Sequence, residues 1–117
     1  MDYNKLCKDI LSLDTKVRFA GVCDDRGEIA FGGQREGIKN LLTPEETTMS
    51  NLQAWVRWEL RNSFFHKTGR EKYSMEEYEN IKRITFTLDH DHLLLVTTEA
   101  DTEHMKVIDS ILKQLGK

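Results

Sequence analysis

The longest helical pattern in the chain covers residues 43–68 and predicts one long helix. Thr43 has the side chain of an N-cap, and Pro44 suits the first helical position, where no N–H is needed. Glu46 follows Thr43 by three residues and completes a capping box. Gly69 is typical of a residue that ends a helix. The start and the end of this element are therefore both marked by local chemistry.

This predicted helix is apolar on two sides. At about 100° per residue, one side carries Met49, Leu52, Val56, Leu60 and Phe64. The opposite side carries Ala54, Trp55, Trp58 and Phe65. We expect the first side to pack on a sheet of the same chain. The aromatic side then points outward, where it predicts a homodimer interface formed by Trp55, Trp58 and Phe65.

Two helices and five strands are predicted around the long helix. Apolar residues at helical spacing indicate a first helix over residues 2–13 and a last helix after Asp101 or Thr102, with Met105, Ile108, Ile111, Leu112 and Leu115 buried. Alternating patterns indicate strands at 17–23, 28–31, 72–79, 82–88 and 93–98. In strand 82–88, Ile84, Phe86 and Leu88 are expected inward, and Arg83, Thr85 and Thr87 outward.

The order of these elements is α-β-β-α-β-β-β-α. It predicts one α+β domain, residues 1–117, with a five-stranded antiparallel sheet and helices packed on it. Strand 93–98 is the most apolar and is expected at the centre of the sheet. Strand 72–79 is polar, as is typical of an edge, and Met75 on it is expected to join the interface by pairing with the same strand of a second copy.

The sequence VRFAGVCD at residues 17–24, followed by Arg26-Gly27-Glu28-Ile29-Ala30, is a hydrophobic strand, an acidic-Gly turn and a short return strand. With strand 93–96 and the terminal helix, it resembles the roadblock / dynein light chain family. That resemblance implies a profilin-like fold and a non-catalytic homodimeric scaffold or regulator of signalling, acting on a Ras-like small GTPase or another signalling protein. The chain is also similar to small uncharacterised archaeal proteins. It departs from the family pattern in its Trp-rich and Phe-rich second helix and in the acidic strand that follows.

Composition narrows the function classes. Of the 117 residues, 38% are hydrophobic and 32% are charged, and the formal net charge is -3, which gives no general reason to expect nucleic-acid binding. No apolar run approaches the roughly 20 residues that span a bilayer, and the N-terminus lacks the apolar core of a signal peptide. We therefore expect a cytoplasmic protein without membrane insertion.

No residue pattern predicts a catalytic, cofactor or metal site. Residues 89–92, with the sequence DHDH, are interpreted as a solvated turn, because neighbouring strand residues point to opposite faces and cannot share a metal easily. Cys7 and Cys23 are too far apart for a zinc knuckle or a redox pair and are expected as buried, reduced thiols. The lone His66 and His104 are expected to have a surface or capping role. The glycines around residues 32–37 lack the ending of a phosphate-binding loop.

Two alternatives stay open. The basic residues Arg57, Arg61, Lys67 and Arg70 form weak ion pairs with the acidic run at 76–79, or they dock an acidic partner. The aromatic side of the helix lines a ligand pocket rather than an interface, as expected for a sensor domain of the profilin or PAS type. A cavity of several hundred Å³ lined by Trp55 or Trp58 favours this second function, whereas a flat aromatic face favours the dimer.

Overall fold

A computed structural model describes residues 1–117 and contains one antiparallel sheet in the order β2-β1-β5-β4-β3. The strands are β1 (Val17–Cys23), β2 (Ile29–Gln34), β3 (Tyr73–Glu77), β4 (Ile81–Asp89) and β5 (His92–Glu99). The apolar β5 lies at the centre between β1 and β4, and the polar β3 is an edge strand, so both predictions are confirmed. The predicted α+β class and element order are confirmed as well.

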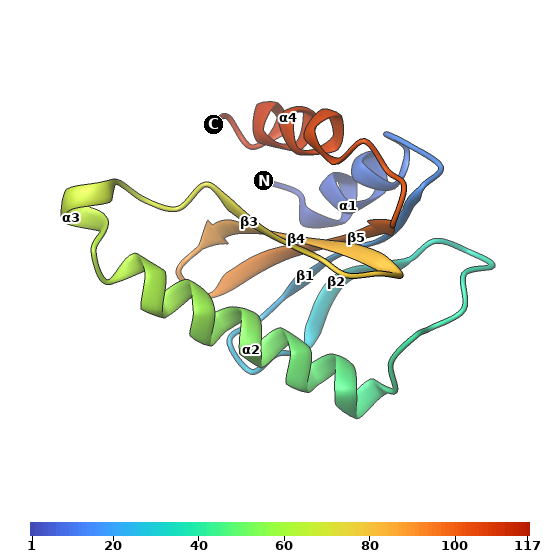
Figure 1. Ribbon diagram of the computed structural model, residues 1–117, viewed down its shortest axis with the longest axis horizontal. Helices are drawn as coiled ribbons and strands as arrows, with labels where there is room; N and C mark the ends of the chain where they lie inside the picture. The colour runs from blue at the N-terminus through green and yellow to red at the C-terminus, as the bar shows by residue number, and fades with distance from the viewer.

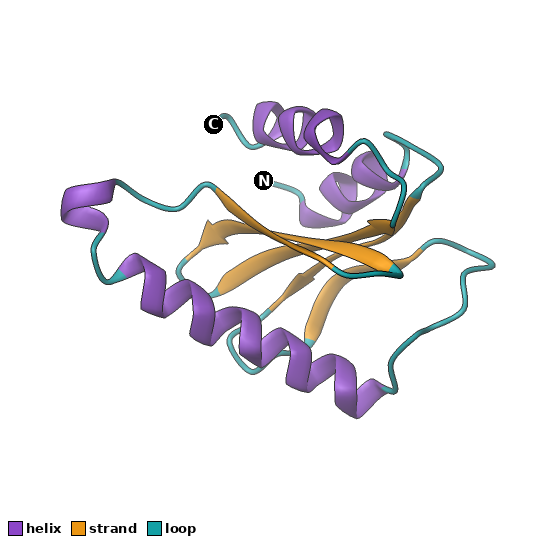
Figure 2. Ribbon diagram, in the orientation of Figure 1, coloured by secondary structure: helices purple, strands orange, loops and turns teal.

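Helices cover both faces of the sheet (Figure 1). They are α1 (Tyr3–Leu11), α2 (Pro44–Asn62), α3 (Phe65–Thr68) and α4 (His104–Gln114). Figure 2 shows α1 and α4 side by side above one face, together with both chain termini, and α2 alone along the other face. No helix has the combined length and apolar character that crossing a membrane requires.

The long helix is shorter than predicted, because α2 ends at Asn62 and the single turn of α3 follows. The Ser63 hydroxyl donates to the Leu60 carbonyl at 2.7 Å and so competes with the helical pattern. Phe64 then leaves helical geometry, with φ -109° and ψ 17°. Gly69, at φ 80°, ends α3 and not the long helix itself.

The main core lies between the sheet and the helices α1 and α4. It is built from Leu6, Cys7, Ile10, Val17, Ala20, Val22, Ile84, Phe86, Leu94, Val96, Val107, Ile108 and Ile111. A smaller cluster lies on the other face, beneath α2, and consists of Cys23, Ala54, Trp55, Leu93 and Leu95, with Phe19 and Trp58 packed against it. Cys7 and Cys23 are buried and free, as predicted, and lie on opposite faces of the sheet.

The start of the last helix differs from the prediction. Glu103, and neither Asp101 nor Thr102, occupies the N-cap position. The Asp101 carboxylate instead accepts a 3.0 Å hydrogen bond from Lys16, and Thr102 is buried. Met105 was expected in the buried stripe but is 47% exposed, because it lies in the first turn on the side away from the core.

Candidate protein interface

The helix α2 begins as its sequence predicts. The Thr43 hydroxyl accepts from the Glu46 backbone N–H at 3.1 Å, and the Glu46 carboxylate accepts from the Thr43 backbone N–H at 2.9 Å. This reciprocal capping box, with Pro44 at the first helical position, fixes where α2 begins and how its faces are turned.

The inner face of α2 is held to the turn between β1 and β2. The Trp55 indole N–H donates to the Asp24 carbonyl at 2.7 Å, and the Asn51 amide donates to the Gly27 carbonyl at 2.9 Å. Trp58 meets Trp55 edge to face with ring centroids 5.7 Å apart. These contacts bury Trp55 to 5% exposure. The aromatic side of α2 therefore faces the sheet.

The predicted assignment of the two sides of α2 is thus wrong. Trp55 and Trp58, expected in an interface, pack on the second cluster, and Leu60, expected in the core, is 66% exposed. The physical reason is that a buried indole needs an acceptor for its N–H, and the Asp24 carbonyl supplies one beneath the helix. The aliphatic side has no such polar requirement and points outward.

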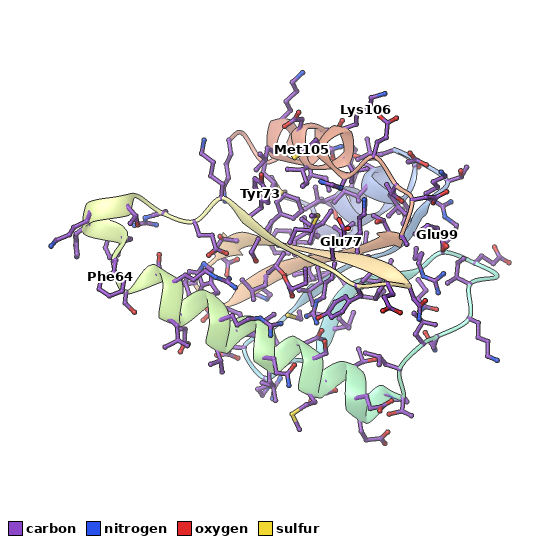
Figure 3. The ribbon with its side chains drawn as sticks, in the orientation of Figure 1. Phe64, Tyr73, Glu77, Glu99, Met105 and Lys106 are labelled. Carbon is purple, nitrogen blue, oxygen red and sulfur yellow. The ribbon has the colours of Figure 1, made fainter.

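The outward side of α2 carries a continuous apolar row, which we call the outer stripe. Its exposed fractions run from 37% to 66%. The outer stripe consists of Met49, Leu52, Val56, Leu60 and Phe64. In Figure 3, Phe64 lies at the C-terminal end of α2, apart from the body of the sheet. An apolar row of this length on one exposed helix face is typical of a protein interface.

The outer stripe is nearly symmetrical along the helix. Leu52 and Leu60 lie four residues on either side of Val56. The two ends of α2 carry opposite charges. Glu45 and Glu46 lie in the first turn, whereas the basic residues cluster near and beyond the C-terminal end. A helix with this pattern is complementary to an antiparallel copy of itself.

The predicted basic zone is largely used within the chain. Arg57 pairs with Glu76 at 3.1 Å, and Arg61 pairs with Glu71 at 3.4 Å. Arg70 lies over the Phe65 ring, 5.6 Å from its centroid. These contacts tie α2 and α3 to the segment around β3, in agreement with the simpler of the two interpretations of this zone.

The edge strand β3 pairs only with β4, so the backbone along its other side is not paired within the chain. Met75 packs partly buried against the main core, together with Tyr73. Phe65 is half-buried and its ring lies 3.9 Å from that of His66. The contribution of Met75 and Phe65 to an interface stays a prediction.

A cavity of about 450 Å³ opens between the N-terminal half of α2, the sheet and the segment 34–42. Neither Trp55 nor Trp58 lines it. Leu41 and Leu42, which lie just before α2, are more than 40% exposed and form part of the cavity wall. The remainder of its lining combines apolar groups such as Phe19 with several polar side chains.

Arg83 is the buried cation of this cavity. It is 6% exposed, and its guanidinium donates to the hydroxyl of Ser50 and, at 3.1 Å, to the Ser50 carbonyl. It takes part in no ion pair, because Glu76, opposite it on β3, is engaged by Arg57. Burial lowers the pKa of Arg83 from its usual value, although the charge of Glu76 acts in the other direction.

Sequence reasoning missed Arg83, because strand alternation predicts it on an outward face with Thr85. That face is covered by α2, and Thr85 is also buried. The nearby Arg18 pairs with Glu99 at 2.5 Å and donates to the Lys39 carbonyl at 3.1 Å, so it holds the segment that closes the cavity. Figure 3 places Glu99 on the side of the molecule where this segment runs.

The remaining candidate residues make contacts within the fold. Asp89 and His92 lie at the hairpin between β4 and β5, where Asp89 accepts from the Tyr3 hydroxyl at 2.7 Å and lies 3.0 Å from His92 Nδ1. His104 Nδ1 lies 2.9 Å from the buried Lys82 ammonium. Gly32 lies in β2 with φ 79° and is packed against Cys7. Each of these contacts joins two elements of the fold.

Comparison with known proteins agrees with this architecture. The model of a family described as a family of unknown function, DUF6659, matches residues 1–117. No curated protein matches the sequence.

Several solved structures are similar over nearly the whole chain. A Roadblock/LC7 domain from Streptomyces avermitilis has a TM-score of 0.71 and 12% identity, and the match covers 99% of this chain and 93% of that one. The gliding protein MglB from Thermus thermophilus has a TM-score of 0.74 and 10% identity, covering 97% and 82%. An MglB with tetrameric arrangement has a TM-score of 0.72 and 12% identity, covering 97% and 81%. At these identities the likeness establishes a Roadblock/LC7-like fold.

Proposed function

Because the chain belongs to DUF6659, a family of unknown function, and folds like a Roadblock/LC7 domain, we propose that it is a non-catalytic homodimeric interaction module whose copies meet through α2. The observation that carries this proposal is the outer stripe. Its four members within α2 extend over residues 49–60, which corresponds to about 16 Å of helix at 1.5 Å per residue, and Phe64 follows just beyond the end of the helix. Water contact along such a row is unfavourable, and burial against a partner removes it.

A second copy of the chain fits the outer stripe better than an unrelated helix does. In an antiparallel pair with its two-fold axis at Val56, Leu52 of each copy lies against Leu60 of the other. The acidic first turn of each α2 then lies near the basic C-terminal region of its mate. Both the apolar pattern and the charge pattern are therefore satisfied by the same symmetry.

The partner of the dimer is inferred from the family resemblance. That resemblance implies a scaffold or regulator of signalling that binds a Ras-like small GTPase. The sensor function is less well supported as the primary role, because the two tryptophans expected to line its pocket are packed on the sheet instead. A dimer that meets through α2 alone leaves the edge strand β2 available to a further protein, and it leaves β3 available either to that protein or to the same strand of the second copy, as predicted for Met75.

The dimer is tested by multi-angle light scattering at concentrations from one to one hundred micromolar. We expect the wild type to have twice the chain mass, and Val56→Asp to be monomeric and folded, because the new carboxylate lies at the centre of the apolar contact. Met105→Asp is the matched control, since it places the same charge at an exposed apolar residue on α4. A monomeric wild type, or a Val56→Asp protein that remains dimeric, contradicts the proposed interface.

The GTPase partner needs a separate test. Purified Ras-like GTPases from the same organism are loaded with GDP or a non-hydrolysable GTP analogue, and binding to the dimer is measured by calorimetry. We expect binding that differs between the two nucleotide states. Absence of binding in both states contradicts the GTPase partner and leaves the dimer as an independent result.

A further inference from the structure

The cavity beneath the N-terminal half of α2 has no role in the proposed dimer, because the outer stripe lies on the opposite side of the helix. We propose that it binds a small organic carboxylate with an apolar body, whose carboxylate pairs with Arg83. This inference is independent of the dimer and of the GTPase partner.

The first argument is that the buried positive charge of Arg83 has no ion-pair partner. A buried guanidinium has five N–H donors, and this one has two hydrogen bonds, both to Ser50, and no ion pair. Transfer of a charge out of water is unfavourable unless an opposite charge accompanies it. An anion in the adjoining cavity supplies that charge and accepts the remaining donors.

The second argument is the position of the neighbouring charges. Glu76 lies opposite Arg83 in the sheet, but its ion pair is with Arg57 and not with Arg83. Arg18, at the other side of the cavity, is already paired with Glu99. The one acidic side chain in the cavity wall is Glu79, which is exposed to solvent. Within the cavity, Arg83 is therefore the cation that lacks a carboxylate.

The third argument is the size and lining of the space. A volume of about 450 Å³ lies within the range of small-molecule sites and far exceeds that of a few waters. Apolar side chains of Phe19, Leu42 and Leu95 contribute to its wall, next to polar groups from Asn40 and Tyr78. A single buried guanidinium in a largely apolar lining fits a monoanion with an apolar body. Inorganic phosphate lacks the apolar body that the walls at Phe19, Leu42 and Leu95 would cover.

Octanoate is a suitable probe, because it joins a carboxylate to a short apolar chain. Octan-1-ol has the same chain without the charge, and inorganic phosphate has charge without the chain. Binding is followed through the shifts of backbone amide signals in two-dimensional NMR of the full chain. We expect saturable binding of octanoate that shifts the amides of Ser50, Arg83 and Leu95, and at least tenfold weaker binding of octan-1-ol and phosphate.

Arg83→Met tests the residue itself, because it keeps much of the side-chain volume and removes the charge. We expect octanoate to bind at least about tenfold more weakly to this variant. Arg61→Met is the matched control. Arg61 lies on α2, but it pairs with Glu71, away from Glu76, and does not line the cavity, so the octanoate affinity of this variant should equal that of the wild type.

Three results would overturn the proposal. They are the absence of saturable octanoate shifts at these amides, equal affinity for octanoate and octan-1-ol, and equal affinity of the wild type and Arg83→Met. If Arg83→Met does not fold, the comparison of octanoate, octan-1-ol and phosphate on the wild type decides the question by itself.

Discussion

Trp55 and Val56 are neighbours in the chain, yet the Trp55 ring is buried against the sheet while Val56 is 56% exposed on the far side of α2. The indole N–H of Trp55 is also bonded to the Asp24 carbonyl, which lies in the turn after β1. Stability and assembly are therefore assigned to different sides of one helix, and substitutions on the two sides should have different effects.

The inner side should control stability. In the monomeric Val56→Asp background, Trp55→Ala should lower the free energy of unfolding by about 3–5 kcal/mol, because it opens a cavity and leaves the Asp24 carbonyl without its donor. Leu60→Ala in the same background should lower it by less than about 1 kcal/mol, because Leu60 is exposed in the monomer. Urea unfolding followed by circular dichroism measures both values. Equal losses for the two variants would show that the sides of α2 are assigned wrongly here.

Two adjacent glycines in β2 provide a second matched pair. A Cβ at Gly32 would lie 2.2 Å from the Ala20 carbonyl oxygen and 2.7 Å from the Cys7 sulfur, at a φ of 79°. A Cβ at Gly33 would meet nothing within 4 Å. We expect Gly32→Ala to lower the free energy of unfolding by about 2–4 kcal/mol and Gly33→Ala to change it by less than about 1 kcal/mol. Thermal and urea unfolding of the two variants test this, and a tolerated Gly32→Ala contradicts the close contact between α1 and β2.

The hydrogen bond from Tyr3 to Asp89 gives a prediction in alkaline solution. Burial, followed by the hydrogen bond and the charge of Asp89, raises the pKa of Tyr3 to about 12, above its usual value of 10.0. The folded state favours the neutral phenol. The contribution of Tyr3 to the free energy of unfolding is therefore complete below pH 10 and is lost as the pH rises towards 12. Tyr3→Phe should therefore cost about 1 kcal/mol at pH 7, and its difference from the wild type should shrink between pH 10 and 12.

Urea unfolding at several pH values measures this difference. Tyr78→Phe is the control for general alkaline destabilisation, because Tyr78 is exposed and forms no side-chain hydrogen bond. If the difference in free energy of unfolding between the wild type and Tyr3→Phe stays constant up to pH 12, the stabilisation by Tyr3 does not depend on its ionisation, and the prediction is wrong.

Both cysteines should be unreactive in the folded protein. Burial raises the pKa of the Cys7 thiol to about 11, and it has the same effect on Cys23. The thiolate that attacks a disulfide reagent is therefore scarce at pH 8, and the sulfur atoms are also shielded. With Ellman's reagent, we expect no fast reaction in native protein and two equivalents of thiol in urea. A rapid native reaction at either cysteine contradicts its burial.

The sequence was sufficient for the element order and the sheet, because alternation with a period of two and a strong capping box at Thr43 are local signals. It was not sufficient for the faces of α2. Both sides are apolar, and helical periodicity gives the angle between two stripes but not which one meets the sheet. The decision rests on the Asp24 carbonyl, which becomes an acceptor for Trp55 only after the chain has folded.

The cavity could not be predicted from the sequence, for a related reason. Alternation places Arg83 and Ile84 on opposite faces of β4, and an arginine is ordinarily assigned to solvent. Here helices cover both faces of the sheet, so the arginine is buried as well. The length of the segment between β2 and α2, which closes the cavity, carries no pattern from which its path follows.

The orientation of the two α2 helices in the dimer gives the last prediction. With the two-fold axis at Val56, Leu52 of one copy lies against Leu60 of the other, because both residues are four positions from Val56 and close to the centre of the outer stripe. Both are exposed in the monomer. Leu52→Lys alone should raise the dimer dissociation constant, because it places a charge in the apolar contact. Leu52→Lys combined with Leu60→Glu should bind more tightly than either single variant, because each lysine then lies against a glutamate of the second copy.

Analytical ultracentrifugation measures these dissociation constants at low and high salt. The advantage of the double variant over the single variants should diminish at about 1 M salt, where screening weakens interactions between exposed charges. In a parallel pair of helices Leu52 lies beside its own counterpart, so the double variant would place like charges together at both positions and bind no more tightly than the single variants. That result would rule out the antiparallel arrangement while leaving the outer stripe as the contact.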